Sequence, residues 1–248
     1  MSKKVVVILM GIAFLLMICG GVFLFIDNGK NKEIKDNGVR EEKEVVKKTL
    51  LTEEKLENYQ KDVNMTVVYA DSFLYKEYPI DNFDQLSAEL KTKFLVSTKV
   101  NFKNREVNVS DIESIKGNYF NNFELTLSDI KDDEQVIYKY SNDKFIYNGG
   151  NGDACLFSTK KISDNGYEEF WEIQNKGYYV KEKNSNENVV YKTLNDCRND
   201  ENEVHSYSYE TGGFSDEDFE RIKDDLNTYI YKFSKINDKY LIESVKVK

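Results

Sequence analysis

The sequence predicts an α+β fold in which helices pack on a mainly antiparallel sheet. After about residue 62, short runs alternate apolar or aromatic residues with polar ones, which is typical of strands. Asn, Asp and Gly residues separate many of these runs by a few positions, as in antiparallel hairpins. A few other stretches have the apolar spacing of helices. Residues 63–248 are therefore expected to form one domain with a substantial core, and its sheet is expected to curve, with the cone of NTF2-like proteins as an analogy only.

An uncharged apolar segment from Val5 to Ile26 predicts a transmembrane helix. At about 1.5 Å per residue, such a helix roughly matches a bilayer core of about 30 Å. A cleaved signal peptide is the competing interpretation, with Cys19-Gly20-Gly21 as its processing site, but the apolar run continues beyond these residues. A lipoprotein signal would need a small residue before Cys19, where the chain has Ile18. We therefore expect an uncleaved membrane anchor.

The residues before this segment predict its orientation. Residues 1–4 contain Lys3 and Lys4, which favour a cytoplasmic tail and place the chain from Asp27 onwards outside the membrane. Because these two lysines are the only charged residues before Asp27, the outer part carries a formal charge of −11, compared with −9 for the whole chain. This charge argues against nucleic acid as a partner and favours a cationic or basic partner at the cell surface.

Residues 27–62 predict a charged stalk between the membrane and the domain. Their composition favours helix, and Thr52 is a candidate N-cap. Val45, Leu50 and Leu56 belong to a loose apolar stripe that could pack on the domain. A solvated spacer is the interpretation that we prefer.

The first part of the domain predicts one strand and two helices. Residues 65–78 have the composition of a strand. Residues 81–97 place apolar side chains on one helical face and begin with Asp81 as a candidate N-cap. A second helix is predicted from the capping-box pair Ser110 and Glu113.

The rest of the domain predicts strands, hairpins and one late helix. The helix begins after Ser215 as N-cap, has acidic residues in its first turn, and turns Phe219, Ile222 and Leu226 inwards. The predicted strands and hairpins are, in order, a strand at 123–127, a hairpin at 136–147, a hairpin at 170–183 with its tip at 175–177, a strand at 188–194 and a hairpin at 228–247.

This organisation resembles a known group of proteins. A short basic start, one apolar span, a charged stalk and a domain rich in Tyr, Asn and Lys are similar to uncharacterised membrane-anchored extracytoplasmic proteins of low-GC Gram-positive bacteria. The segments NYFNNFELTLSDI, IYKYSNDKFIYNGGNG and YKFSKINDKYLIESVKV carry the resemblance, which spans most of the outer domain. It implies no activity, substrate or catalytic residue.

The glycines of FIYNGGNGDAC, residues 145–155, raise the question of a phosphate-binding loop. A P-loop needs GxxxxGK[ST], and a dinucleotide site needs GxGxxG within a βαβ unit. The chain has neither pattern, and Asp153 would repel a phosphate. We interpret these glycines as a turn.

Cys155 and Cys197 are the only cysteines after the apolar segment. In an oxidising compartment they could form one disulfide, or they could remain two thiols, and the sequence leaves both alternatives open. No CxxC pair or Cys/His cluster indicates zinc.

Other candidate residues have a structural alternative that we prefer. His205 is the only histidine, and its acidic neighbours make a dedicated catalytic base an unfavourable interpretation. Acidic residues at 196–203 could bind calcium but lack an EF-hand pattern. Glu168 and Glu172 beside Trp171 could suggest a glycosidase pair, yet strand alternation fits them better.

Aromatic side chains are the remaining binding candidates. Trp171, Tyr178 and Tyr179 could form a sugar- or peptide-binding surface, or they could be core and cross-strand contacts. We predict no catalytic, cofactor-binding or metal-binding residue. The functional prediction is an extracytoplasmic binding or interaction module with an envelope protein or glycan partner. The alternative is a cell-wall glycan or peptide hydrolase that uses Asp/Glu chemistry.

Overall fold

The computed structural model describes residues 48–100, 105–132, 134–149 and 154–248. The chain divides into two units, Met1–Val45 and Val46–Lys248, and every described residue belongs to the second. The predicted tail, the span from Val5 to Ile26 and most of the predicted stalk lie outside the described residues. No helix within the described ranges has the length and apolar character needed to cross a membrane.

The first described element is a long helix, α2, at Glu53–Phe73. It shows that the predicted strand at 65–78 was wrong. Val63, Val67 and Ala70 are buried at helical spacing, so the packed face has a period of three to four residues rather than two. Thr52 occupies the N-cap position, but its side chain makes no capping hydrogen bond. The helix also runs through the predicted junction between stalk and domain at residues 62 and 63.

Two further helices begin at residues that the sequence did not predict. Helix α3, at Ala88–Lys99, is capped by Ser87, whose hydroxyl accepts a hydrogen bond from the Leu90 N–H. The predicted cap Asp81 lies before a separate short 3₁₀ helix, η2, at Phe83–Gln85. Helix α4, at Val109–Ile115, follows Asn108 rather than a capping box at Ser110. The predicted strand at 123–127 was also wrong, because this segment has no regular structure.

A small antiparallel sheet has the order β1-β4-β3-β2. Its strands are β1 at Glu106–Asn108, β2 at Ile130–Asp132, β3 at Gln135–Ser141 and β4 at Lys144–Tyr147. The predicted hairpin at 136–147 is confirmed as β3 and β4. Its two-residue turn uses Asn142 and Asp143 at φ of 51° and 57°, which Asn and Asp tolerate better than most residues.

A larger antiparallel sheet is built around one long strand, β6. The strands are β5 at Cys155–Gly166, β6 at Phe170–Asn184, β7 at Glu187–Tyr191, β8 at Glu203–Tyr207, β9 at Asn227–Ile236 and β10 at Lys239–Val247. One edge of β6 pairs with β5, and the other pairs first with β9 and then with β7. The predicted strand at 188–194 and the final hairpin are confirmed as β7 and as β9 with β10.

The predicted hairpin at 170–183 was wrong, because residues 175–177 continue β6. Gly177 pairs with Thr159 on one side and Asn227 on the other. The Tyr229 ring lies directly over it, and a Cβ atom there would be 2.3 Å from the Tyr229 Cε2 atom. This glycine therefore permits close packing between strands rather than a turn.

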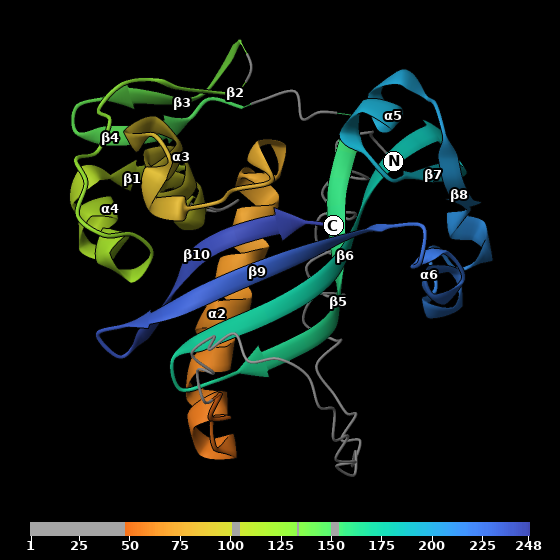
Figure 1. The fold of residues 1–248 in the computed structure, drawn as a ribbon. Helices are drawn as coiled ribbons and strands as arrows, with labels where there is room; N and C mark the ends of the chain where they lie inside the picture. The colour runs from red at the N-terminus through yellow and green to blue at the C-terminus, as the bar shows by residue number, and fades with distance from the viewer. Residues whose placement is uncertain (1–47, 101–104, 133, 150–153) are drawn as a thin grey trace. The chain divides into compact units, whose positions relative to one another are not determined.

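The main core lies where α2 packs on the larger sheet, against β5 and β10 (Figure 1). Trp171, Tyr231 and Phe233 of the sheet are fully buried there, together with Phe94 of α3. The prediction of an α+β class with antiparallel pairing is confirmed, although two sheets form where one was expected.

The late helix, α6, spans Asp216–Ile222 and begins as predicted. The Ser215 hydroxyl accepts from the Asp218 N–H, and the Asp218 carboxylate accepts from the Ser215 N–H, which forms a capping box. Phe219, Ile222 and Leu226 are buried in a cluster with Val190 of β7.

Candidate functional site

A groove of about 580 Å³ runs along α2. This volume lies in the usual range for ligand sites, about 300–1,000 Å³. Its lining combines tyrosine rings with a few polar groups. The lining residues are Asn58, Tyr59, Asp62, Val63, Met65, Thr66, Tyr69, Asn118, Tyr119, Asp238, Lys239 and Tyr240.

Helix α2 supplies the first wall. Asn58, Asp62, Met65 and Tyr69 are spaced by four, three and four residues, so they share one stripe of the helix. The neighbouring stripe, which includes Val63, is buried against the core and fixes the rotation of the helix. Packing on the core therefore determines which α2 side chains line the groove.

Two loops far apart in the sequence supply the second wall. One is the end of η3, a 3₁₀ helix at Lys116–Asn118, with Tyr119 after it, and the other is the turn between β9 and β10 with the start of β10. The Lys239 ammonium donates a hydrogen bond to the Asn118 side-chain oxygen at 2.6 Å and so joins the two loops. Asn237 and Asp238 form the turn with φ of 48° and 59°.

Aromatic contacts hold the tyrosine rings in place. The Tyr240 ring is buried, lies edge-on to Tyr59 and Trp171, and its hydroxyl donates to the Tyr167 carbonyl at 2.6 Å. Tyr119 packs edge-on against Phe94 of the core, with ring centroids 5.3 Å apart. Because their rings contact the core, Tyr240 and Tyr119 form a preorganised surface.

Two carboxylates line the groove and differ in their partners. Asp238 forms an ion pair with Lys235 at 3.6 Å. Asp62 is close enough to Tyr119 to affect its pKa. Burial, together with smaller contributions from Tyr69 and Asp62, raises the pKa of the Tyr119 hydroxyl to about 12. The groove therefore presents the Tyr119 hydroxyl beside the Asp62 carboxylate, with the Lys239 ammonium in the same lining.

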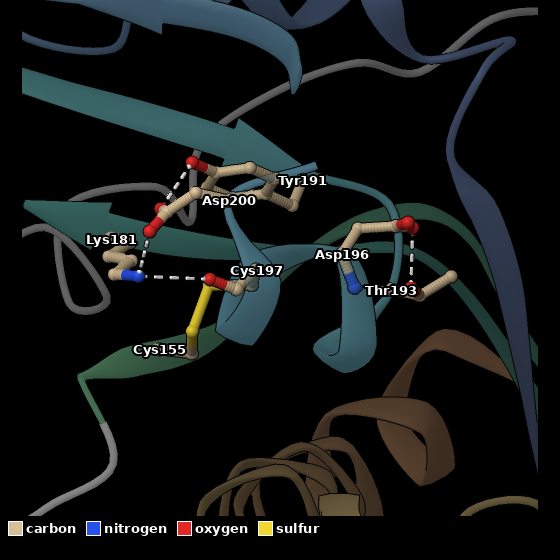
Figure 2. The surroundings of a disulfide bond; sticks show 7 residues. All are labelled: Cys155, Lys181, Tyr191, Thr193, Asp196, Cys197 and Asp200. Carbon is tan, nitrogen blue, oxygen red and sulfur yellow. Dashed lines mark hydrogen bonds and ion pairs between the residues drawn. A yellow bond between two sulfur atoms is a disulfide. The ribbon is translucent and has the colours of Figure 1, made fainter. Parts of the chain in front are cut away.

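The structure joins Cys155 and Cys197 in a disulfide, with their Cα atoms 6.0 Å apart (Figure 2). Both are buried. The bond connects the start of β5 to α5, a short helix at Leu194–Asn199. Lys181 of β6 donates to the Cys197 carbonyl at 3.3 Å, so a side chain also holds this helix to the sheet.

The acidic residues at 196–203 do not converge on one point. Asp196 accepts a hydrogen bond from Thr193, and Asp200 accepts from Lys181 at 2.7 Å and Tyr191 at 3.1 Å (Figure 2). Asp196 also accepts from the Asn202 side chain. The hydrogen bond from Thr193 lowers the pKa of the Asp196 carboxyl, and the hydrogen bond from Lys181 lowers that of Asp200. Glu203 pairs with Lys183. Among the described residues, no cluster of three or more metal-binding side chains occurs.

The remaining sequence candidates have structural partners. His205 lies half-buried on β8, 3.3 Å from Asp218 of α6. Glu168 precedes β6 and pairs with Lys55 of α2 at 2.8 Å, whereas Glu172 accepts from Gln174 within β6. The structure does not bring the two glutamates together by any described contact.

The three aromatic residues that could have formed either a binding surface or core contacts are buried or partly buried. Trp171 is fully buried and Tyr179 nearly so. Tyr178 packs on Phe214 beside α6. Their role as core and cross-strand contacts, the structural alternative, is confirmed. Of the glycine-rich segment, Gly149 is described and has φ of 88°, while residues 150–153 lie outside the described ranges.

One polar network was missed by the sequence analysis. Asp71 of α2 accepts hydrogen bonds from the hydroxyls of Tyr231 at 2.5 Å, Thr159 at 2.8 Å and Tyr78 at 3.0 Å. Burial raises the pKa of Asp71 to about 6, even though these three hydrogen bonds act to lower it. In the sequence, only the single aspartate within the apolar segment VVYADSFL pointed to this network. An aspartate in such a segment also fits the end of a strand.

No protein-family model, curated protein or solved structure matches this chain.

Proposed function

We propose that this protein is a single-pass, membrane-anchored binding module of the bacterial cell envelope and that it binds its partner in the groove beside α2. The observation that carries the proposal is the combination in one groove of rigid tyrosine rings with the polar side chains of Asp62, Asn58 and Asn118. Ring faces and a few convergent polar groups are what ligand sites commonly provide.

The location is proposed from two features. The apolar segment from Val5 to Ile26, with Lys3 and Lys4 before it, supports an anchor whose N-terminus is cytoplasmic. The disulfide between Cys155 and Cys197 supports an oxidising, extracytoplasmic environment for the domain. The resemblance to anchored proteins of low-GC Gram-positive bacteria agrees with both.

The location can be tested by attaching an epitope tag to the C-terminus. Protease added to intact cells should remove the tag, and lysing the cells first should make no further difference. Protection of the tag in intact cells would contradict the proposed topology.

The groove can be tested by filling it. Met65 lies in the groove with 37% of its surface exposed, so Met65→Trp adds bulk there without entering the core. Full-length variant protein should lose binding to purified wall glycan or envelope proteins. Leu127→Trp is the matched control, because Leu127 is 48% exposed and does not line the groove. Equal binding by both variants would contradict the groove as the binding site.

A hydrolase that uses Asp/Glu chemistry is the second candidate, and Asp71 is the observation that favours it. A carboxyl with a raised pKa suits general acid catalysis. Its three described partners are hydroxyls, however, whereas glycoside hydrolysis normally uses two carboxyl groups. Turnover of wall glycan or peptide by the wild type that is abolished in Asp71→Asn would replace the binding proposal with the enzymatic one.

A further inference from the structure

The Asp62 carboxylate stands apart from the other acidic groups of the groove. In the described part of the chain, no cation or hydrogen-bond donor pairs with it, while Asp238 already has Lys235 as a partner. Asp62 lies on the groove stripe of α2 between Asn58 and Met65 and is exposed. Its charge is therefore available to a ligand.

The tyrosine rings add to this negative potential. The face of an aromatic ring attracts cations. Within this protein, the Lys235 ammonium already lies 5.9 Å from the centre of the Tyr59 ring. Among the described residues, Lys239 is the one cation in the groove lining, which also holds the carboxylates of Asp62 and Asp238, so the lining keeps a formal negative charge. Its ammonium hydrogen-bonds to the neutral Asn118 side chain and makes no described contact with Asp62.

We infer that the groove binds a cationic side chain, the ammonium of lysine or the guanidinium of arginine, presented by a basic peptide segment of the partner. This inference rests on the proposed function and specifies the chemistry of its ligand. A neutral sugar could accept and donate hydrogen bonds in the groove, but it would gain no Coulomb attraction from the exposed Asp62 carboxylate. A basic peptide supplies the missing charge, and the net charge of −9 on the chain adds long-range attraction for it.

Met65 provides a direct way to observe binding in the groove. It is the only one of the four methionines that the structure describes, and its side chain lies beside Asp62 on the groove stripe. Full-length protein in a neutral detergent can be labelled with ¹³C at the methionine methyl groups. Its Met65 signal can be assigned as the one that disappears in Met65→Leu.

The probes are a capped Lys-Lys-Lys peptide, a capped Gln-Gln-Gln peptide and the trisaccharide of N-acetylglucosamine. The lysine peptide should shift the Met65 signal with saturation, and the other two probes should shift it much less. Asp62→Asn should raise the Kd of the lysine peptide about three- to fivefold, as expected for one exposed ion pair. Added salt should weaken binding to the wild type more than to the variant.

Asp224→Asn is the control for net charge, because Asp224 is an exposed carboxylate outside the groove lining. It should leave the Kd unchanged. Equal binding of the glutamine peptide or the sugar, or an unchanged Kd in Asp62→Asn, would overturn the inference while leaving a binding groove in place. If no probe moves the Met65 signal, the inference also fails. The proposed function is contradicted by a separate result, which is that Met65→Trp binds envelope material as well as the wild type does.

Discussion

Asp71 is the residue whose environment departs most from what its type would predict. It belongs to α2, yet its three hydrogen-bond donors come from Tyr78, Thr159 of β5 and Tyr231 of β9. These residues are separated by up to 160 positions in the sequence. Burial of the network raises the carboxyl pKa, so the folded state holds a proton more tightly than the unfolded chain does.

This difference predicts how Asp71 affects stability as the pH changes. Its pKa is about 6 in the folded protein and near 3.8 without the fold, so the folded state binds the extra proton between these values. The contribution of Asp71 therefore makes the free energy of unfolding fall as the pH rises from about 4 to about 6, by roughly 2–3 kcal/mol. Asp71→Asn should remove this component, which denaturant unfolding at pH 4 and pH 7 would measure.

Asp132 provides a control of opposite sign. Burial acts to raise its pKa, but hydrogen bonds from Lys93 and Lys76 outweigh burial and lower it. Its contribution to stability should be present above pH 4 and should be lost as the pH falls below that value. Asp132→Asn should therefore weaken the fold at neutral pH and leave the Asp71 effect intact. An unchanged pH dependence in Asp71→Asn would contradict the assignment.

At the scale of elements, the turn and the helix cap that were predicted correctly depend only on residues a few positions apart in the sequence. The turn at Asn142 and Asp143 and the N-cap at Ser215 need no distant partner. The predictions for 65–78 and 170–183 failed because distant packing decides these segments. Helix α2 has β-branched and aromatic residues, and its helical form is stabilised by burying one face on the sheet.

Gly177 gives a test of packing between strands. A Cβ at this position would lie 2.3 Å from the Tyr229 ring and 3.0 Å from Phe157, so Gly177→Ala should force β6 and β9 apart. We expect a loss of about 1–3 kcal/mol in the free energy of unfolding, measured by denaturant titration. Gly117→Ala is the matched control, because a Cβ there meets nothing within 4 Å. Equal stability of the two variants would contradict close packing of the Tyr229 ring as the reason for a glycine at position 177.

At the scale of the described unit, the disulfide links the start of β5 to α5 across 42 residues. The intervening chain includes β6 and β7, so the bond encloses the central strand of the larger sheet. Cross-linking a loop of this length restricts the unfolded chain, which stabilises the folded state by about 4 kcal/mol in the chain-entropy model.

Replacing both cysteines by serine should therefore lower the free energy of unfolding by about 3–4 kcal/mol. The outer domain of the wild type should also migrate more slowly after reduction in gel electrophoresis, and the double variant should not. Identical migration of the wild type with and without reductant would show that the bond is absent in the cellular protein.

The groove could not be predicted from the sequence, because it forms only when distant segments of the folded unit come together. Its lining comes from residues 58–69, from 118–119 and from 238–240, and no short motif marks any of the three. The sequence did contain the tyrosines, but it could not distinguish Trp171, which is fully buried, from Tyr59 and Tyr119, which reach the groove. Exposure of an aromatic ring depends on which elements pack over it.

The sequence by itself determined the α+β class, the antiparallel pairing of its late strands, the net acidic charge and the cap of α6, because composition, two-residue periodicity and local hydrogen bonds act over short distances. Only the tertiary structure decided that residues 65–73 are helical, that Cys155 meets Cys197, and that Asp71 and Asp62 lie in different environments. The physical reason is that burial and charge compensation depend on neighbours brought together by folding, and those neighbours are distant in the chain.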